Sequence, residues 1–221
     1  MARSALLGLA LGAGTARAQG LYAALNDSIL AREGLASVRE FVGANNLAQA
    51  ARVVQGVLDS DAERVIESPD DAGVFVPVRD RVHAELLASA PLLARYREAE
   101  GPRAQQLLDA GELALVERTR LLTRAGLTAA VRLAQQELEA ARFHSARFFL
   151  EELRDHPDRK VDREACDSCA ALARLLARVL PEPEAIALDK EFAQDAAALG
   201  LHPAEPKAGT PGPVATCEAI V

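Results

Sequence analysis

The sequence predicts an all-helical protein of stacked antiparallel helical hairpins, and three observations lead to this prediction. Half of the 221 residues are hydrophobic, but only 4% are aromatic and tryptophan is absent, so the apolar content is mostly Ala, Leu and Val. Ala and Leu favour helices, and the small Ala side chain lets two helices approach closely. Apolar residues also recur at spacings of three and four, and turn-forming residues interrupt this pattern at short intervals.

The charge of the chain excludes a general affinity for polyanions. The net charge is −7 at pH 7, so neither nucleic acid nor an anionic membrane is an expected partner. Acidic and basic residues are interspersed, which is typical of a solvated helix surface.

Residues 1–18 are interpreted as a cleavable secretory signal peptide. Arg3 is the only charge before a weakly apolar run over residues 5–13, and small residues surround a cleavage site after Ala18. An apolar helix retained in the domain is the alternative. The run is shorter than the roughly 20 residues that a membrane-spanning helix needs, and no other segment of the sequence is long and apolar enough. We therefore expect a periplasmic or secreted protein without a transmembrane segment after cleavage.

The rest of the chain is predicted to hold one helical domain, residues 19–201, and a disordered Pro- and Gly-rich tail, residues 202–221. The first hairpin begins near Ser28 and turns at residues 43–46, whose Gly-Ala-Asn-Asn sequence suits turns and caps. Its two apolar stripes have helical spacing and consist of Leu35, Val38, Val42, Leu47, Ala50, Ala51, Val54, Val57 and Leu58. Two helices joined by such a short turn form an antiparallel pair.

A loop is expected to interrupt the helices between residues 68 and 78. Residues 68–73 are rich in turn formers, and the next five, Val74 to Val78, have the composition of a short strand. Pro77 lacks the N–H that a central strand needs, so an extended loop is preferred. Phe75 is expected to fill the core from this loop.

Two helices should follow the loop. Val78, Val82 and Leu86 share one face of the first helix. Pro suits the first turn of a helix, so the second is expected to start at Ala90-Pro91 and to end at Gly101-Pro102, which would open the next one.

Residues 123–157 form the most regular part of the sequence. Two apolar stripes flank a turn over residues 141–144, and His156-Pro157 ends the second helix. The first stripe consists of Leu127, Val131, Ala134, Leu138 and Ala141, and the second of Ala146, Phe149, Leu150 and Leu153. A further helix pair is expected around the breakers Pro181 and Pro183, with apolar stripes of Leu172, Leu175, Leu176 and Val179, then Leu188, Phe192 and Leu199.

The unit 123–157 resembles a tetratricopeptide repeat. Its length is close to the period of about 34 residues. Leu133-Ala134 matches the large-then-small pair of the repeat's first helix, and segment 141–146 matches the inter-helix turn, in which an aromatic residue precedes an Ala by three positions. Leu150 and Pro157 also match, whereas Glu137 or Leu138 replaces the usual late aromatic residue. Segments 45–50 and 110–116 echo the turn more weakly.

The resemblance implies a curved stack of hairpins whose concave face binds a peptide or a partner domain. By the same resemblance, Thr128, Gln135 and Glu139 on the first helix of this unit would line that face. A helical bundle without repeats is the alternative fold.

The arrangement from Ala23 to about Leu153 also resembles the N-terminal helical region of exported bacterial proteins that continue into a pyrroloquinoline-quinone-type β-propeller. The features that carry this resemblance are the hairpin over 35–57, the loop over 73–79, residues 96–98 and 101–104, the turn over 107–113 and the repeat unit after it. No evenly spaced short strands follow Leu201, so this chain would be a truncated or stand-alone helical part. The resemblance implies a β-propeller domain as a partner, and no residue matches a quinone site.

Cys166 and Cys169 are the strongest candidates for chemistry. On a helix the two thiols share a face, so they suit a local disulfide or two metal ligands. Unpaired thiols are the alternative, since no second Cys-x-x-Cys occurs and no His follows Cys169. Cys217 makes the number of cysteines odd.

The sequence contains no other recognised catalytic or phosphate-binding motif, so an enzyme, a cofactor or a metal site is not expected. Among the four histidines, His144 should be exposed in a turn, whereas His156 and His202 precede Pro and suit the capping of carbonyls. The leading hypothesis is a non-catalytic protein–protein interaction scaffold of the bacterial cell envelope. The alternatives are the truncated propeller protein and a thiol-redox or metal-binding protein that uses Cys166 and Cys169.

Overall fold

The computed structural model describes residues 27–69 and 71–201, so the predicted signal peptide and tail lie outside the described residues. This part of the chain forms nine helices and two short strands, with the following bounds: α1 Ile29–Gly43, α2 Leu47–Asp61, β1 Val65–Glu67, β2 Phe75–Pro77, α3 Val78–Ala88, α4 Ala90–Asp109, α5 Leu113–Arg120, α6 Arg124–Glu139, α7 Phe143–Glu152, α8 Arg163–Val179 and α9 Pro183–Ala198. The predicted helical class is confirmed. In residues 27–69 and 71–201, no helix is long and apolar enough to cross a bilayer.

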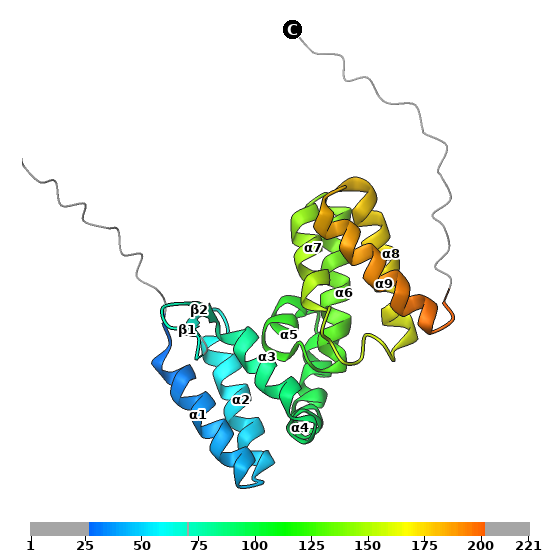
Figure 1. Cartoon of the computed structure of the whole chain (residues 1–221). Coiled ribbons are helices and arrows are strands. Elements are labelled where there is room, and N and C mark those ends of the chain that lie inside the picture. The colour runs from blue at the N-terminus through cyan, green and yellow to red at the C-terminus, as the bar shows by residue number, and fades with distance from the viewer. Residues whose placement is uncertain (1–26, 70, 202–221) are drawn as a thin grey trace, which may run out of the picture.

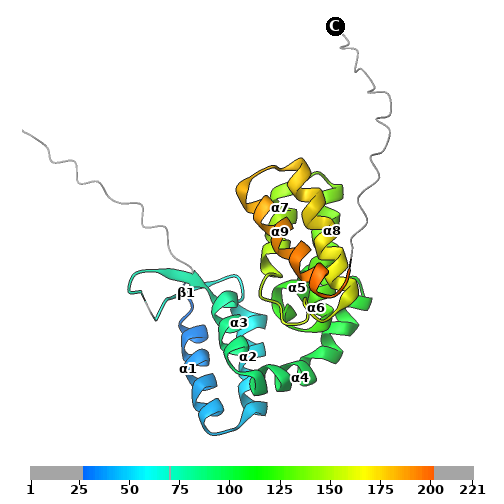
Figure 2. The ribbon, with the colours of Figure 1, turned by 45° about the vertical axis from the view of Figure 1, so that its right-hand side comes forward.

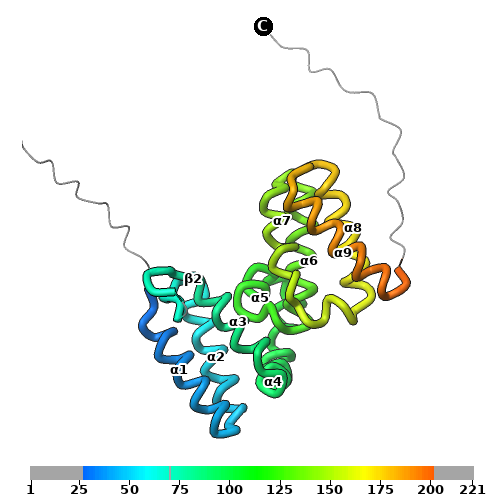
Figure 3. Tube along the Cα trace, viewed as in Figure 1, coloured from blue at the N-terminus to red at the C-terminus, as the bar shows by residue number. Residues whose placement is uncertain are grey.

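The helices form two packed groups with α4 and α5 between them (Figures 1 and 2). The first group holds α1 to α3 and the strand pair, and the second holds α6 to α9; the Cα trace shows α1 far from α8 and α9 (Figure 3). Each group has its own hydrophobic core, and a smaller third cluster lies between α4, α5 and α6. Helix α4 joins these cores, because Leu92 and Tyr96 belong to the first and Leu107 to the third.

The first hairpin follows the predicted pattern. Both of its stripes face inward, since Leu35, Val38, Ala50 and Val54 are buried. Ser28 caps α1, as its Oγ accepts from the Ala31 N–H at 2.9 Å. Local sequence signals and packing therefore agree here.

The three segments that echo a repeat turn share one backbone geometry. Each has a residue with positive φ just past the first helix: Asn45 (55°), Gly111 (82°) and Ala141 (56°). The N–H of the next residue then bonds to a carbonyl five residues back, from Asn46 to Phe41 (2.8 Å), Glu112 to Leu107 (3.0 Å) and Arg142 to Glu137 (2.8 Å). This is the Schellman arrangement of helix ends. In each segment, the residue that aligns with the repeat's Ala lies in the following helix and is buried; these residues are Ala50, Val116 and Ala146.

The loop predicted over Val74–Val78 is wrong in part, because Phe75–Pro77 is a strand. It pairs antiparallel with Val65–Glu67, with Ile66 opposite Val76. Side chains alternate along a strand, so Ile66 and Val76 face the core while Phe75 faces the other side. Phe75 is half-buried and outside the core, so Ile66 takes the role that was expected of it. The pair has only two strands, so Pro77 is on an edge and is tolerated there.

The predicted helix end at Gly101-Pro102 is also wrong, since α4 continues through Pro102 to Asp109. Proline removes the N–H that would bond to the Glu98 carbonyl. Both Pro102 and Glu98 are exposed, so water can hydrate that carbonyl. Gly101 has no Cβ to clash with the proline ring, which permits helical geometry before proline.

The predicted stripe of α8 is only partly correct. Leu176 is fully buried, but Leu175 is 37% and Val179 49% exposed. The core face of α8 instead consists of small side chains, namely Cys166, Cys169, Ala170 and Ala173. This face packs against α6, α7 and α9, where small residues permit close approach.

One buried charge organises the connection between α7 and α8. Arg159 is 1% exposed, ion-pairs with Glu191 (3.1 Å) and Asp195, and lies over the Phe192 ring at 4.5 Å. All three partners belong to α9. The connection is therefore held to α9 by paired charge and aromatic contact together.

Candidate functional site

Two of the three predicted partner-binding residues line a polar groove between α4, α6 and α8. Thr128 and Gln135 line this groove, which has a volume of about 410 Å³. Glu139 lies beyond its edge and accepts a hydrogen bond from Gln135 Nε2 at 2.8 Å. The structure thus brings two of the three predicted residues into one groove and places the third beside it. The remaining lining residues are Gln105, Leu108, Arg124, Val131, Arg132, Asp162, Glu164, Ala165 and Ser168.

The polar side chains of this groove are mostly engaged locally. Gln105 bonds to Asp109 one turn along α4 (2.8 Å), and the Thr128 hydroxyl donates to the Arg124 carbonyl (3.2 Å). These bonds are short-range and exposed to solvent, so a bound polypeptide can replace them at small net cost. Leu108 is buried at the base of the groove and provides an apolar surface.

Arg132 is the residue of this groove that sequence reasoning missed. It is exposed and lies four residues after Thr128, so it shares the same face of α6. Its guanidinium forms no ion pair or hydrogen bond with another described residue. The sequence does contain a signal for Arg132, because it lies four residues after Thr128 and three before Gln135, on the same helix face. A free guanidinium is a strong donor for carboxylates or backbone carbonyls of a partner.

A second hollow lies between the strand pair, α5 and α7. Its volume is about 420 Å³, and Pro77, Arg79, Phe148 and Phe149 are among the residues that line it. Arg79 is 13% exposed and ion-pairs with Glu117 (2.8 Å) and with Glu152 (2.9 Å). Its guanidinium also lies 5.8 Å from the ring centroid of Phe148, which is 45% exposed. These pairs neutralise the buried arginine, so its role is to join α3 to α5 and α7.

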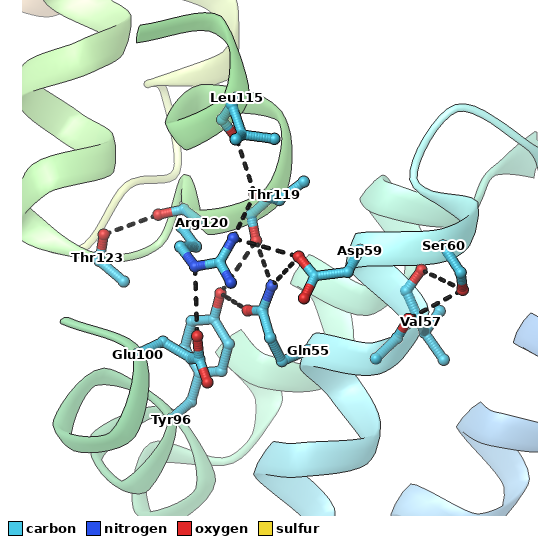
Figure 4. A network of polar contacts seen from close by, with 11 residues as sticks. Gln55, Val57, Asp59, Ser60, Tyr96, Glu100, Leu115, Thr119, Arg120 and Thr123 are labelled. Carbon is cyan, nitrogen blue, oxygen red and sulfur yellow. Dashed lines mark hydrogen bonds and ion pairs between the residues drawn. The ribbon is translucent and has the colours of Figure 1, made fainter. Parts of the chain in front are cut away.

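A buried polar network joins α2, α4 and α5 (Figure 4). The Tyr96 hydroxyl donates to Gln55 Oε1 (3.0 Å) and lies 3.3 Å from the Thr119 carbonyl oxygen. Arg120 ion-pairs with Asp59 at 3.2 Å. Burial raises the pKa of Tyr96, so the phenol stays protonated as a donor. The network satisfies its buried polar groups and offers no activated nucleophile.

Cys166 and Cys169 are free, buried thiols on the core face of α8. Burial raises the pKa of Cys166, and it raises the pKa of Cys169 to about 12. A thiol with a raised pKa has little thiolate at neutral pH and reacts slowly. The predicted disulfide stays a prediction, and Cys217 lies outside the described residues. Within residues 27–69 and 71–201, no three His, Cys, Asp or Glu side chains are placed to hold a metal ion.

The histidines differ in their surroundings. His144 is exposed in α7 as predicted. His156 is 2% exposed and receives the Asp158 N–H at Nδ1 (3.1 Å), so Nε2 carries the proton and donates to the Leu121 carbonyl (3.0 Å). The expected role at a carbonyl thus holds, but the carbonyl belongs to the end of α5. Burial lowers the pKa of His156 to about 4.

Comparison with known proteins finds no match: no protein family, no curated protein and no solved structure is similar to this chain.

Proposed function

We propose that this chain is a non-catalytic scaffold that binds a polypeptide in the groove between α4, α6 and α8. The observation that carries this proposal is the joint lining of the groove by the first helices of three successive hairpins, with Arg132 unpaired among the described residues. Gln135 and Thr128 can exchange their local hydrogen bonds for bonds to a peptide backbone. Leu108 supplies apolar contact below them.

The packing pattern supports a tetratricopeptide-like stack as part of the proposal. The first helices of the hairpins, α4, α6 and α8, begin 34 and 39 residues apart. Contacts run between neighbouring first helices, α4 with α6 and α6 with α8, and between the second helices α7 and α9. In repeat stacks such contacts between equivalent helices create a continuous concave face. The Schellman turns that α4–α5 shares with α6–α7 favour the same interpretation.

Site-specific photocrosslinking tests the proposed groove. A photoreactive phenylalanine at Gln135 should crosslink a polypeptide from a cell-envelope extract, whereas the same residue at His144, exposed on the second helix α7, should not. The captured partner is then purified and its affinity measured. Arg132→Ala and Gln135→Ala are each expected to weaken binding about tenfold, as truncation of a central contact does.

His144→Ala is the matched control and should bind as the parent chain does. Equal crosslinking from both positions would contradict the proposal. Unchanged affinity in the Arg132→Ala and Gln135→Ala variants would also contradict it.

A further inference from the structure

A small acidic pocket lies away from the groove, between α3, the end of α5 and the end of α7. Its volume is about 260 Å³, far more than the roughly 15 Å³ that one water needs. Four carboxylates line it, together with two histidines and apolar side chains: Asp80, Glu151, Glu152, Asp155, His83, Ala84, Leu87, Leu121, Leu122 and His156. No described lysine or arginine is among these lining residues.

His83 gives this pocket a specific hydrogen-bonding group. The residue is 9% exposed, and its Nε2 is buried with no hydrogen-bond partner in the described part of the chain. Such an orphaned polar atom costs free energy unless something bonds to it. A neutral imidazole can present Nε2 as an acceptor, and in that form the atom lacks a donor.

His156 cannot supply that donor. Both of its ring nitrogens are engaged, one with the Asp158 N–H and the other with the Leu121 carbonyl. Arg79 does not supply it either, since its guanidinium bonds to Glu117 and Glu152 and forms no hydrogen bond with His83 Nε2. A donor for Nε2 would therefore come from a molecule that enters the pocket.

The carboxylates define the charge of that molecule. Glu151 ion-pairs with Arg147 at 3.4 Å, and Glu152 ion-pairs with Arg79 at 2.9 Å. Asp80 lies 3.9 Å from Arg79, at the limit of an ion pair. Asp155 is exposed and forms no ion pair with a described residue, so its charge remains unneutralised in a pocket that also holds a buried ring nitrogen without a partner. The pocket does not suit a metal ion, because no three His, Cys, Asp or Glu side chains in the described residues are placed to ligate one.

We infer that this pocket binds an organic cation, a guanidinium or a primary ammonium, which donates to His83 Nε2 and is neutralised by Asp155. The cation carries several N–H donors, so it can serve the imidazole and the carboxylates at once. The exposed Phe148 lines the hollow between the strand pair, α5 and α7, and Arg79 of that hollow ion-pairs with Glu152 of this pocket at 2.9 Å. An arginine or lysine side chain of a polypeptide can therefore place its cation in the pocket and its neighbouring residues against that ring. This site is separate from the groove between α4, α6 and α8.

Ligand titration followed by NMR tests the inference. The probes are the blocked amino acids N-acetyl-arginine methylamide and N-acetyl-lysine methylamide, with N-acetyl-citrulline methylamide as the uncharged control. The cationic probes should cause saturable shifts at the imidazole of His83 and at the amides of residues 151–156, and citrulline should not. A second titration uses the small guanidinium and methylammonium ions. If they bind as tightly as the blocked amino acids, the natural ligand is a small free cation. If they bind more weakly, the ligand is an arginine or lysine side chain of a polypeptide.

Variants separate the acidic and the imidazole contributions. Asp155→Asn should raise the midpoint concentration of the titration at least fivefold. Asp167→Asn, the same change at an exposed position of α8, should leave the midpoint within twofold. His83→Leu should raise the midpoint at least tenfold. His83→Gln keeps an acceptor near the same position and should restore most of the binding. If His83→Leu does not fold, the other three variants still decide the question.

Three results would overturn the inference. The first is the absence of saturable shifts with either blocked cation, which would mean that water alone fills the pocket. The second is equal binding of citrulline, and the third is an unchanged midpoint in Asp155→Asn. None of these results affects the groove, whose crosslinking test uses other residues.

Discussion

Gly126 shows how a single residue sets the approach of two elements. A Cβ at this position would lie 2.2 Å from the Leu121 carbonyl oxygen and 2.3 Å from that of Arg120. Both atoms belong to the backbone at the end of α5, so they cannot turn aside as a side chain can. The first turn of α6 therefore fits against α5 only because residue 126 has no side chain.

Replacement of this glycine should be strongly destabilising. We expect Gly126→Ala to lower the free energy of unfolding by about 3 kcal/mol, the upper range for overpacking, because backbone must move. Urea unfolding followed by circular dichroism measures this change. Gly56→Ala is the matched control: the position is inside α2 with open space around it, so about 1 kcal/mol of stabilisation is expected from helix propensity. Equal effects of the two substitutions would contradict the geometry.

Ala141 offers the opposite prediction. Its φ of 56° is strained for a residue with a Cβ, and the equivalent position of the α4–α5 turn holds Gly111. Ala141→Gly should therefore stabilise the protein by about 0.5–1 kcal/mol, since the relief of strain exceeds the added chain entropy. The same unfolding assay measures it. Ala140→Gly, with a negative φ, is the control and should be destabilising.

His83 and His156 make stability depend on pH. Their folded-state pKa values, about 3 and about 4, lie below the ordinary value of 6.5, mainly because both rings are buried. A depressed pKa means that the unfolded chain binds the proton more tightly than the folded chain. The stabilising contribution is therefore complete above pH 6.5 and declines as the pH falls toward the folded-state values.

Between pH 7 and pH 5 each buried histidine should lower the free energy of unfolding by about 2 kcal/mol. His83→Gln should remove its share of this difference, whatever the stability of the variant at pH 7. Unfolding curves in urea at the two pH values provide the measurement. Exposed His144→Gln serves as the control, and the idea fails if His83→Gln keeps the full pH dependence of the parent chain.

At the scale of the elements, helical periodicity predicted the helix hairpins well where local signals and burial coincide. Asn46 and Thr123 cap α2 and α6 through their side chains, and the small residues Ala50 and Ala146 lie buried after their turns. These features are local, so a single sequence contains them. Phe75 shows the limit, because its face depends on the pairing of β2 with β1 and a shift of one residue reverses the faces.

Burial against distant elements was harder to predict. Apolar spacing identified α8 as a helix, yet Cys166 and Ala173 face the core while Val179 is exposed. The neighbours α6, α7 and α9 decide which side is covered, and their positions are not encoded in the local pattern. His83 in the candidate pocket was missed for the same reason, because residues from α3, α5 and α7 surround it only after folding.

The packing of α8 predicts unreactive thiols. Cys166 and Cys169 are each 1% exposed, and burial raises the pKa of both. With a thiol reagent at pH 8, both should react at least a hundredfold more slowly in the native chain than in denaturant. Cys217 lies outside the described residues, so the Cys217→Ser variant is used to isolate the pair. Fast native labelling of either residue would contradict this packing, and failure to label in denaturant without reductant would indicate the alternative disulfide.

At the scale of the whole molecule, the three hairpins α4–α5, α6–α7 and α8–α9 leave an open groove between their first helices. The first helices α4, α6 and α8 contribute to the groove, while the second helices α5, α7 and α9 do not line it. Polar residues with exchangeable bonds and the unpaired Arg132 suit an extended polypeptide more than a buried small molecule. We therefore expect a partner to contact one helix of each of the hairpins α4–α5, α6–α7 and α8–α9.

Hydrogen–deuterium exchange with the crosslinked partner measures this directly. We expect bound partner to slow exchange in segments 105–108, 124–135 and 164–168, which contribute the groove residues of α4, α6 and α8. Exchange in α5, α7 and α9 should stay within twofold of the free protein. Protection confined to α5, α7 or α9, with the groove helices unchanged, would contradict the account.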